Sequence, residues 1–433
     1  MGNFKAGSAV AVVNLDDFCF PNAESVALYG EICVRVVVFE TDRRFAILSA
    51  DMPSMFDNDL TYCRDLLQEV TGAAPEDVWV TVTHCYSAPH TWDLEGRPGG
   101  GRAPKAMEDP AMRAAQVRIN DAFRAAYRQA AEGAVADLRE AVAGFGTGSC
   151  AINVNRNMYT VDGWWKGTNP DGYTDKHLAV VRIDDLQGSP IAILYNYSVQ
   201  ITAGAGPIPD AGGRVANADI SGVASRYIET EFGHDCAAIF LCGAAGDQVP
   251  LLLINYCETD KDGKLREREV SLGMAGFAVV NAQGYMLGNA VAKAAASIKD
   301  LRPVSAIQTA RRNYICGCQK REGEMRSKRP THEYSFVPDG TRELPIYAML
   351  LDDIALIGLL PEMDGITMAQ IRESSPFEKT LVASFVNGNA KSMPQAESYE
   401  LLQYTAINSP FVAGSAEQTR DVAVALLNEL RRN

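Results

Sequence analysis

The sequence predicts an α/β protein whose strands and helices pack as an α+β sandwich. Apolar segments of strand length alternate with amphipathic helical segments along most of the 433 residues. Several strands lead directly into polar turns that contain glycine, which is where functional sites tend to lie. The apolar content of 47% and the charged content of 22% are typical of a globular chain. We expect a single domain over residues 1–433.

Runs of β-branched side chains indicate the strands. Val78, Val80 and Val82 alternate with other side chains, which is the two-residue period of a strand. A polar turn separates the two strands of each predicted pair. The predicted pairs lie at 32–51, 177–198 and 344–363, and a further buried strand begins the segment 235–247.

Amphipathic periodicity indicates the helices. Gly72 and Gly233 lie where two of them are expected to end. Ser415 is expected to cap the last helix, with Gln418 as its partner in a capping box. The predicted helices lie at 57–70, 110–142, 220–233, 282–298 and from 415 onward.

A segment rich in glycine, proline and arginine at 93–110 cannot contribute to a core. It follows a polar strand end, so we expect a mobile, lid-like loop. A plain surface excursion is the alternative, and it is the commoner use of such segments.

The net charge of the chain limits the classes of partner that it is expected to bind. The formal net charge is -14, which disfavours nucleic acid, and no apolar run is long enough to span a bilayer. The start of the sequence lacks the pattern of a signal peptide, and the ten cysteines are scattered. We expect a cytoplasmic protein with reduced thiols that acts on a small molecule. No pattern in the sequence sets an oligomeric state.

The strand at 78–82 ends in "THCYSAP", a cluster of metal-capable and nucleophilic side chains. His84 is the first candidate, because histidine is the commonest metal ligand, although most histidines serve other roles. Tyr86 and Ser87 follow it, and Ser87 is a candidate to contact substrate.

Other strand ends carry further candidates. Asn155 and Arg156 lie on a likely turn, where a guanidinium suits a carboxylate or an oxyanion. Gly246 and Asp247 are expected in a turn whose backbone N–H groups could bind an anion. The alternative is a tight turn that only connects a strand to a loop. Glu362 follows a predicted strand.

The order of these motifs resembles that of the neutral/alkaline, non-lysosomal ceramidase family, from about residue 10 to the C-terminus. Each motif alone is weak, but the ordered set is specific. The matching segments are 83–89, 154–156, 174–176, 217–225, 246–250, 361–362 and 387–388. The resemblance implies the catalytic domain of that family without its C-terminal immunoglobulin-like domain.

The family holds a zinc ion with two His, a Glu and a Tyr. The resemblance places His84 and Glu362 at two of these positions. Gln200 stands where the second His is expected, and the Tyr falls near Ser392. We expect His84, Glu362 and Gln200 to bind a divalent metal, either zinc or, in an oxygen-rich site, manganese or magnesium.

The resemblance also indicates altered chemistry. Val249 stands where the family has its nucleophilic Ser, while the Arg that binds the oxyanion corresponds to Arg156. We expect a hydrolase that uses metal-activated water on an amide or related carbonyl of a small polar substrate, and not on ceramide. Arg156, Tyr86 and Asp247 are the expected catalytic residues, and Gly246, Asn155 and Ser87 are expected to bind substrate. The alternatives are a degenerate binding or regulatory protein, or an enzyme with recruited non-hydrolytic chemistry in a biosynthetic pathway.

Overall fold

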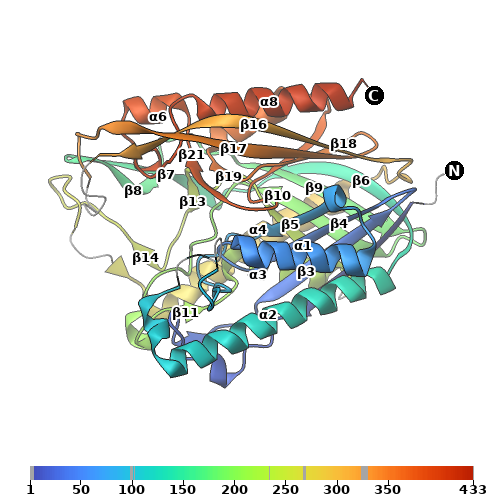
Figure 1. The fold of residues 1–433 in the computed structure, drawn as a ribbon, viewed down its shortest axis with the longest axis horizontal. Coiled ribbons are helices and arrows are strands. Elements are labelled where there is room, and N and C mark those ends of the chain that lie inside the picture. The colour runs from blue at the N-terminus through green and yellow to red at the C-terminus, as the bar shows by residue number, and fades with distance from the viewer. Residues whose placement is uncertain are drawn as a thin grey trace.

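The computed structural model describes residues 4–97, 101, 103–233, 235–266, 270–322 and 330–432. The elements form four layers, with two sheets between two layers of helices (Figure 1). The α/β sandwich predicted from the sequence is therefore confirmed. No helix of the described part of the chain is long and apolar enough to cross a membrane.

The larger sheet has eight strands in the order β12-β10-β9-β6-β1-β3-β4-β5. The two pairs that matter for the site are parallel, β4 with β5 and β10 with β12. The bounds are β1 (Lys5–Val12), β3 (Cys33–Glu40), β4 (Arg44–Ala50), β5 (Val78–Val82), β6 (Arg139–Ser149), β9 (His177–Asp185), β10 (Pro190–Tyr197) and β12 (Ala237–Cys242).

Both faces of this sheet are buried, which explains the continuous apolar runs of its central strands. In β3, Val36 and Val38 pack against the helices, whereas Val37 and Phe39 pack against the second sheet. The helices on the first face are α1 (Asp57–Thr71), α2 (Pro110–Ala136), α3 (Asp219–Phe232) and α4 (Phe277–Ser297).

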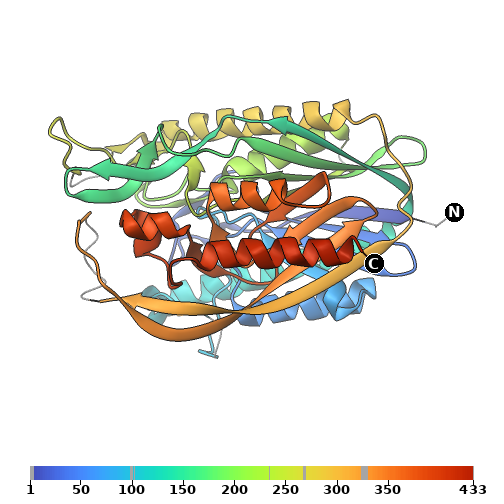
Figure 2. The ribbon, with the colours of Figure 1, turned by 90° about the horizontal axis from the view of Figure 1, so that it is seen from above.

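The second sheet has the order β16-β17-β18-β20, and α8 lies across its outer face (Figure 2). Its strands are β16 (Ile307–Arg321), β17 (Phe336–Leu351), β18 (Ile354–Gly358) and β20 (Lys379–Ala383). The helices on this side are α5 (Gly365–Glu373), α6 (Ala396–Glu400), α7 (Tyr404–Ile407) and α8 (Ser415–Leu430).

Short strands surround the end of the sandwich where the candidate site lies. Three of them form the sheet β13-β7-β8, and β19 pairs with β21. The bounds are β7 (Asn153–Thr160), β8 (Gly163–Asn169), β13 (Gln248–Pro250), β19 (Pro361–Met363) and β21 (Ala390–Met393); the remaining pairs are β2 (Ala27–Leu28) with β11 (Val215–Ala216), and β14 (Asn255–Tyr256) with β15 (Val270–Ser271).

Asn155 and Arg156 do not lie on the predicted turn, because β7 continues through both residues and pairs with β13 on one side and β8 on the other. Two predicted details of the helices are also wrong. The helix predicted at 110–142 ends at Ala136, because the chain from Arg139 is a strand that pairs first with β1 and, from Ala141, with β9. Ser415 does not cap the last helix, since Gly414 is the N-cap residue and no side chain accepts a cap hydrogen bond. Gln418 instead donates to the carbonyl oxygen of Ile315. In both places a contact with a distant strand outweighs the local pattern.

The predicted lid-like loop at 93–110 lies only partly within the described residues, since 98–100 and 102 fall outside them. Asp93 accepts hydrogen bonds from the backbone and side chain of Arg97, so the first turn of the loop is ordered. A function as a lid stays a prediction.

Candidate functional site

Segments that follow four strands meet at one end of the sandwich. Tyr86, after β5, donates its backbone N–H to Ile201 O, after β10, at 3.0 Å. Gly246, after β12, donates its N–H to Met363 O in β19 at 2.8 Å. The sheet is curled, so that its edge strand β12 contacts β3, β4 and the opposite edge strand β5. The site therefore lies beyond the carboxyl ends of parallel strands, as in many α/β proteins.

His84 is fixed by its backbone and by one carbonyl group. Its φ of 57° is unusual for a non-glycine residue, and its side chain is buried. Nδ1 lies 2.6 Å from Pro53 O, and a carbonyl oxygen only accepts, so Nδ1 carries the proton. Burial lowers the pKa of His84, against the opposing effect of Glu362. The imidazole is therefore neutral, with the lone pair of Nε2 directed into the site.

Glu362 and Gln200 face this lone pair, as the sequence predicts for three residues of one site. Nε2 of His84 lies 3.5 Å from Oε1 of Glu362 and 3.4 Å from Nε2 of Gln200. The other oxygen of Glu362 accepts a hydrogen bond of 3.1 Å from Ser392 Oγ. Nε2 of His84 and Oε1 of Glu362 are both acceptors, so neither donates to the other, and Oε1 is left to accept a hydrogen from a bound molecule.

Arg156 is a buried cation without an ion-pair partner among the described residues. It is 8% exposed, its Nη1 donates to Gln200 Oε1 at 2.9 Å, and its Nε has no acceptor. Its guanidinium lies over the ring of Tyr404, 5.3 Å from the ring centre. An unpaired buried charge is costly unless a ligand neutralises it, so Arg156 marks a site for an anion or a developing negative charge.

Aromatic rings enclose the imidazole. Phe385 stacks on His84, with ring centroids 4.0 Å apart, and Tyr86 meets it edge-on at 4.8 Å. Tyr86 is 37% exposed, so its phenol borders the solvent. Low-polarity surroundings and Glu362 raise the pKa of Tyr86, which keeps its hydroxyl protonated.

Asp247 and Asn155 support the site and do not face it. Asp247 accepts hydrogen bonds from Asn155 Nδ2 (2.9 Å) and Gly365 N (2.8 Å). Burial and the neighbouring Asp364 raise the pKa of Asp247. Its backbone oxygen accepts from Arg156 N at 2.8 Å, so this pair positions the strand that carries Arg156.

Gly246 and Ser87 also use their polar groups inside the protein. The N–H of Gly246 is taken by Met363 O, and a Cβ at this position would lie 2.8 Å from Glu362 O. Glycine is therefore required here for the close approach of β19. Ser87 Oγ donates to Asp219 Oδ2 at 3.1 Å. The turn at Gly246 positions Glu362 and offers its own N–H to no ligand.

The residues present do not fit the zinc ion that the resemblance implies. A catalytic zinc usually has three protein ligands, and His84 and Glu362 supply two. Gln200 directs its amide nitrogen toward His84, because Arg156 holds the amide oxygen. Within the part of the chain that the structure describes, no group of three His, Cys, Asp or Glu side chains is placed to hold a metal.

Sequence analysis missed three residues of the site, namely Phe385, Tyr404 and Pro53. Phe385 comes from the segment after β20 and Tyr404 from α7, and no local pattern marks either one. Pro53 contributes only its carbonyl oxygen, which any residue type would supply. The nearest motif was Asn387-Gly388, which follows Phe385 after Val386 and does not itself include the ring.

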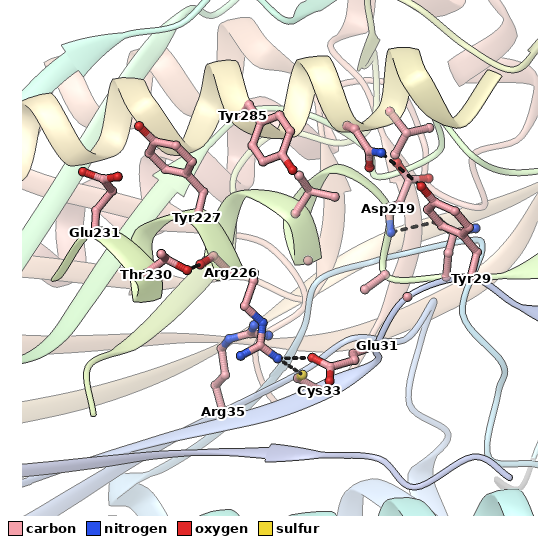
Figure 3. Close-up of a pocket in the computed structure, with 17 residues that line it drawn as sticks. Tyr29, Glu31, Cys33, Arg35, Asp219, Arg226, Tyr227, Thr230, Glu231 and Tyr285 are labelled. Carbon is pink, nitrogen blue, oxygen red and sulfur yellow. Dashed lines mark hydrogen bonds and ion pairs between the residues drawn. The ribbon is translucent and has the colours of Figure 1, made fainter. Parts of the chain in front are cut away.

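A separate cavity of about 670 Å³ lies between α3, α4 and the segment that precedes β3 (Figure 3). Tyr29, Tyr227 and Tyr285 line it, and Arg226 crosses it to pair with Glu31. Because this arginine already has a carboxylate partner, the cavity lacks the unpaired buried charge that distinguishes the site at Arg156.

The fold is that of the neutral ceramidases. A solved structure of a ceramidase in complex with C2 matches with a TM-score of 0.74 at 13% identity, over 100% of this chain and 76% of that one. The neutral ceramidase from Pseudomonas aeruginosa matches with a TM-score of 0.72 at 14% identity, over 100% and 75% of the two chains. No known family description matches the sequence, and no curated protein sequence does. At these identities the likeness establishes the fold alone.

Proposed function

We propose that this protein is a hydrolase that cleaves an amide or a related carbonyl bond in a small polar substrate other than ceramide. The observation that carries the proposal is the convergence of neutral His84, Glu362 and the unpaired buried Arg156. Hydrolysis of a carbonyl group requires a base that activates water and a positive charge that stabilises the oxyanion. These three side chains supply both.

In the proposed reaction, a water molecule donates one hydrogen to Oε1 of Glu362, while Nε2 of His84 accepts an N–H of Gln200 and thereby orients the amide that holds Arg156. Glu362 takes a proton as the water oxygen adds to the carbonyl carbon, and Arg156 stabilises the resulting oxyanion. The C–N bond then breaks, and Tyr86 protonates the departing amine. Tyr86 recovers a proton from Glu362, so the products are a carboxylic acid and an amine.

The other expected site residues have supporting roles in this proposal. Asp247 and Asn155 position the strand of Arg156, while Gly246 allows β19 to approach. The expected divalent metal is not part of the proposed reaction, because only His84 and Glu362 are oriented as ligands. The single catalytic domain and the lid-like loop at 93–110 remain part of the proposal.

The test is turnover of a panel of small N-acyl amides and of a short-chain ceramide, followed by mass spectrometry. We expect cleavage of members of the amide panel, no cleavage of ceramide, and a loss of about 100-fold or more in Glu362→Gln and Arg156→Met. The matched control is Glu378→Gln, which makes the same change at an exposed carboxylate. Ceramide cleavage, or full activity of Glu362→Gln, would contradict the proposal.

A second candidate function is binding without turnover. Val249 favours it, because this apolar side chain occupies the expected nucleophile position and is buried within β13 opposite Val154. Calorimetric binding of a panel member without product, abolished in Arg156→Met, would identify a binding protein.

A further inference from the structure

We propose that Arg156 and Gln200 together take the place of a metal ion in this site, so that its positive charge is a guanidinium group. The inference deepens the proposed function and rests on the same site. It concerns how the site is charged, whereas the proposed function concerns what the site does. The two statements can therefore fail separately.

The orientation of Gln200 follows from its two neighbours. Arg156 Nη1 can only donate, so the atom 2.9 Å away must be the amide oxygen of Gln200. The amide nitrogen then faces Nε2 of His84 at 3.4 Å. Because Pro53 O fixes the proton on Nδ1, Nε2 has a lone pair that accepts this N–H. The atoms that link Arg156 to Pro53 through Gln200 and His84 thus form three contacts, each between a donor and an acceptor.

This series of hydrogen bonds opposes metal binding through the orientation of the Gln200 amide. A metal at His84 and Glu362 needs a third ligand, and Gln200 could offer its oxygen only by turning its amide over. The turned amide would direct its N–H groups at the guanidinium of Arg156, so two donors would face each other.

Arg156 is held in this arrangement by its surroundings. It is buried, its ring partner is Tyr404, and its backbone N–H is bound to Asp247 O. Gln200 is likewise anchored by its backbone N–H, which donates to Gln248 O at 2.8 Å. We therefore assign Gln200 as a positioning residue, which orients both the imidazole and the guanidinium.

The test is titration with Zn²⁺ of the purified, chelator-treated protein and of the variant Gln200→His. The variant supplies two His and one Glu, so we expect its zinc affinity to exceed that of the unaltered protein by about 100-fold or more. Gln200→Met is the matched control, because it removes the amide and adds no ligand. We expect no gain in this control, and loss of the gain when His84→Ala is combined with Gln200→His.

Arg156→Met provides an independent variant if Gln200→His fails to fold. Removing the guanidinium frees the Gln200 amide to turn, so zinc or manganese should bind more tightly than to the unaltered protein. Tight, stoichiometric zinc in the unaltered protein that is lost in His84→Ala would overturn the inference, as would the absence of any gain in both variants. The titration uses no substrate, so a failure to find hydrolysis leaves its result intact.

Discussion

The imidazole of His84 stacks on the ring of Phe385, with ring centroids 4.0 Å apart and planes inclined by 22°. The backbones of both residues are left-handed, with φ values of 57° and 61°. Such conformations cost about 1–3 kcal/mol each in a non-glycine residue, and they persist where the surroundings enforce them. Two strained turns from different sheets thus meet face to face at the candidate site.

Replacement of Phe385 tests how much this contact contributes. The ring is fully buried, so Phe385→Ala should reduce the free energy of unfolding by about 3–5 kcal/mol, measured by urea denaturation. The control is Leu186→Ala in the exposed turn between β9 and β10, which should change it by less than about 0.5 kcal/mol. Equal effects in the two variants would mean that Phe385 is not a core residue.

Asn387 joins the Phe385 segment to β5. Its Oδ1 accepts a hydrogen bond from Val80 N at 2.8 Å, and its Nδ2 donates one to Val78 O at 3.0 Å. The side-chain amide thus replaces the backbone groups of a neighbouring strand. Asn387→Gly removes both bonds but tolerates the φ of 55°, so it isolates the hydrogen bonds from backbone strain. We expect a loss of about 2–4 kcal/mol, because two buried backbone groups lose their partners.

Hydrogen exchange of the Val80 amide provides the second measurement for Asn387. It should exchange faster in Asn387→Gly, and Asn387→Ala should be less stable than the glycine variant by about 1 kcal/mol, because alanine resists a positive φ. Unchanged protection of Val80 in both variants would show that the side-chain bonds do not hold this segment.

Arg35 forms a buried ion-pair cluster in β3. Its guanidinium lies 2.6 Å from Glu229 Oε1 and 3.2 Å from Asp51 Oδ2, and all three side chains are buried. Arg35→Met leaves two buried carboxylates without a cation, so we expect a loss of about 3–5 kcal/mol in urea denaturation. Arg128→Met, at the exposed pair with Glu69, is the control and should cost less than about 1 kcal/mol. Similar losses in both would contradict the cluster's importance.

His177 should make stability depend on pH. Burial and Arg372 lower its pKa to about 4, against the opposing effect of Asp175, and its Nε2 has no partner among the described residues. The unfolded chain binds a proton at a pKa of about 6.5, so stability is complete above that pH and declines as the pH falls toward 4.

The measurement is urea denaturation at several pH values between 7 and 4. His177→Gln should lose about 1–3 kcal/mol less than the unaltered protein across this range. His332→Gln, at an exposed histidine, should follow the unaltered protein. An identical pH profile for all three proteins would exclude His177 as the source.

Elements with a strong local signal were predictable. The two-residue period at Val78, Val80 and Val82 gave β5, and Gly72 marks the end of α1 with a φ of 71°. The helix prediction was wrong at 139–142, because the helical pattern there is weaker than the strand pairing with β1 and with β9, a strand that begins at His177. Pairing between segments far apart in the chain cannot be predicted from the local sequence of either segment.

The sequence by itself determined the α/β class, most elements and the choice of His84, Glu362, Gln200 and Arg156 as candidates for one site. Only the tertiary structure decided that these side chains meet, and that Gln200 turns its amide nitrogen toward His84. The physical reason is that periodicity and turn chemistry act over a few residues. The direction of a buried side chain depends on the partners that distant segments bring to it, here Arg156 and the carbonyl oxygen of Pro53.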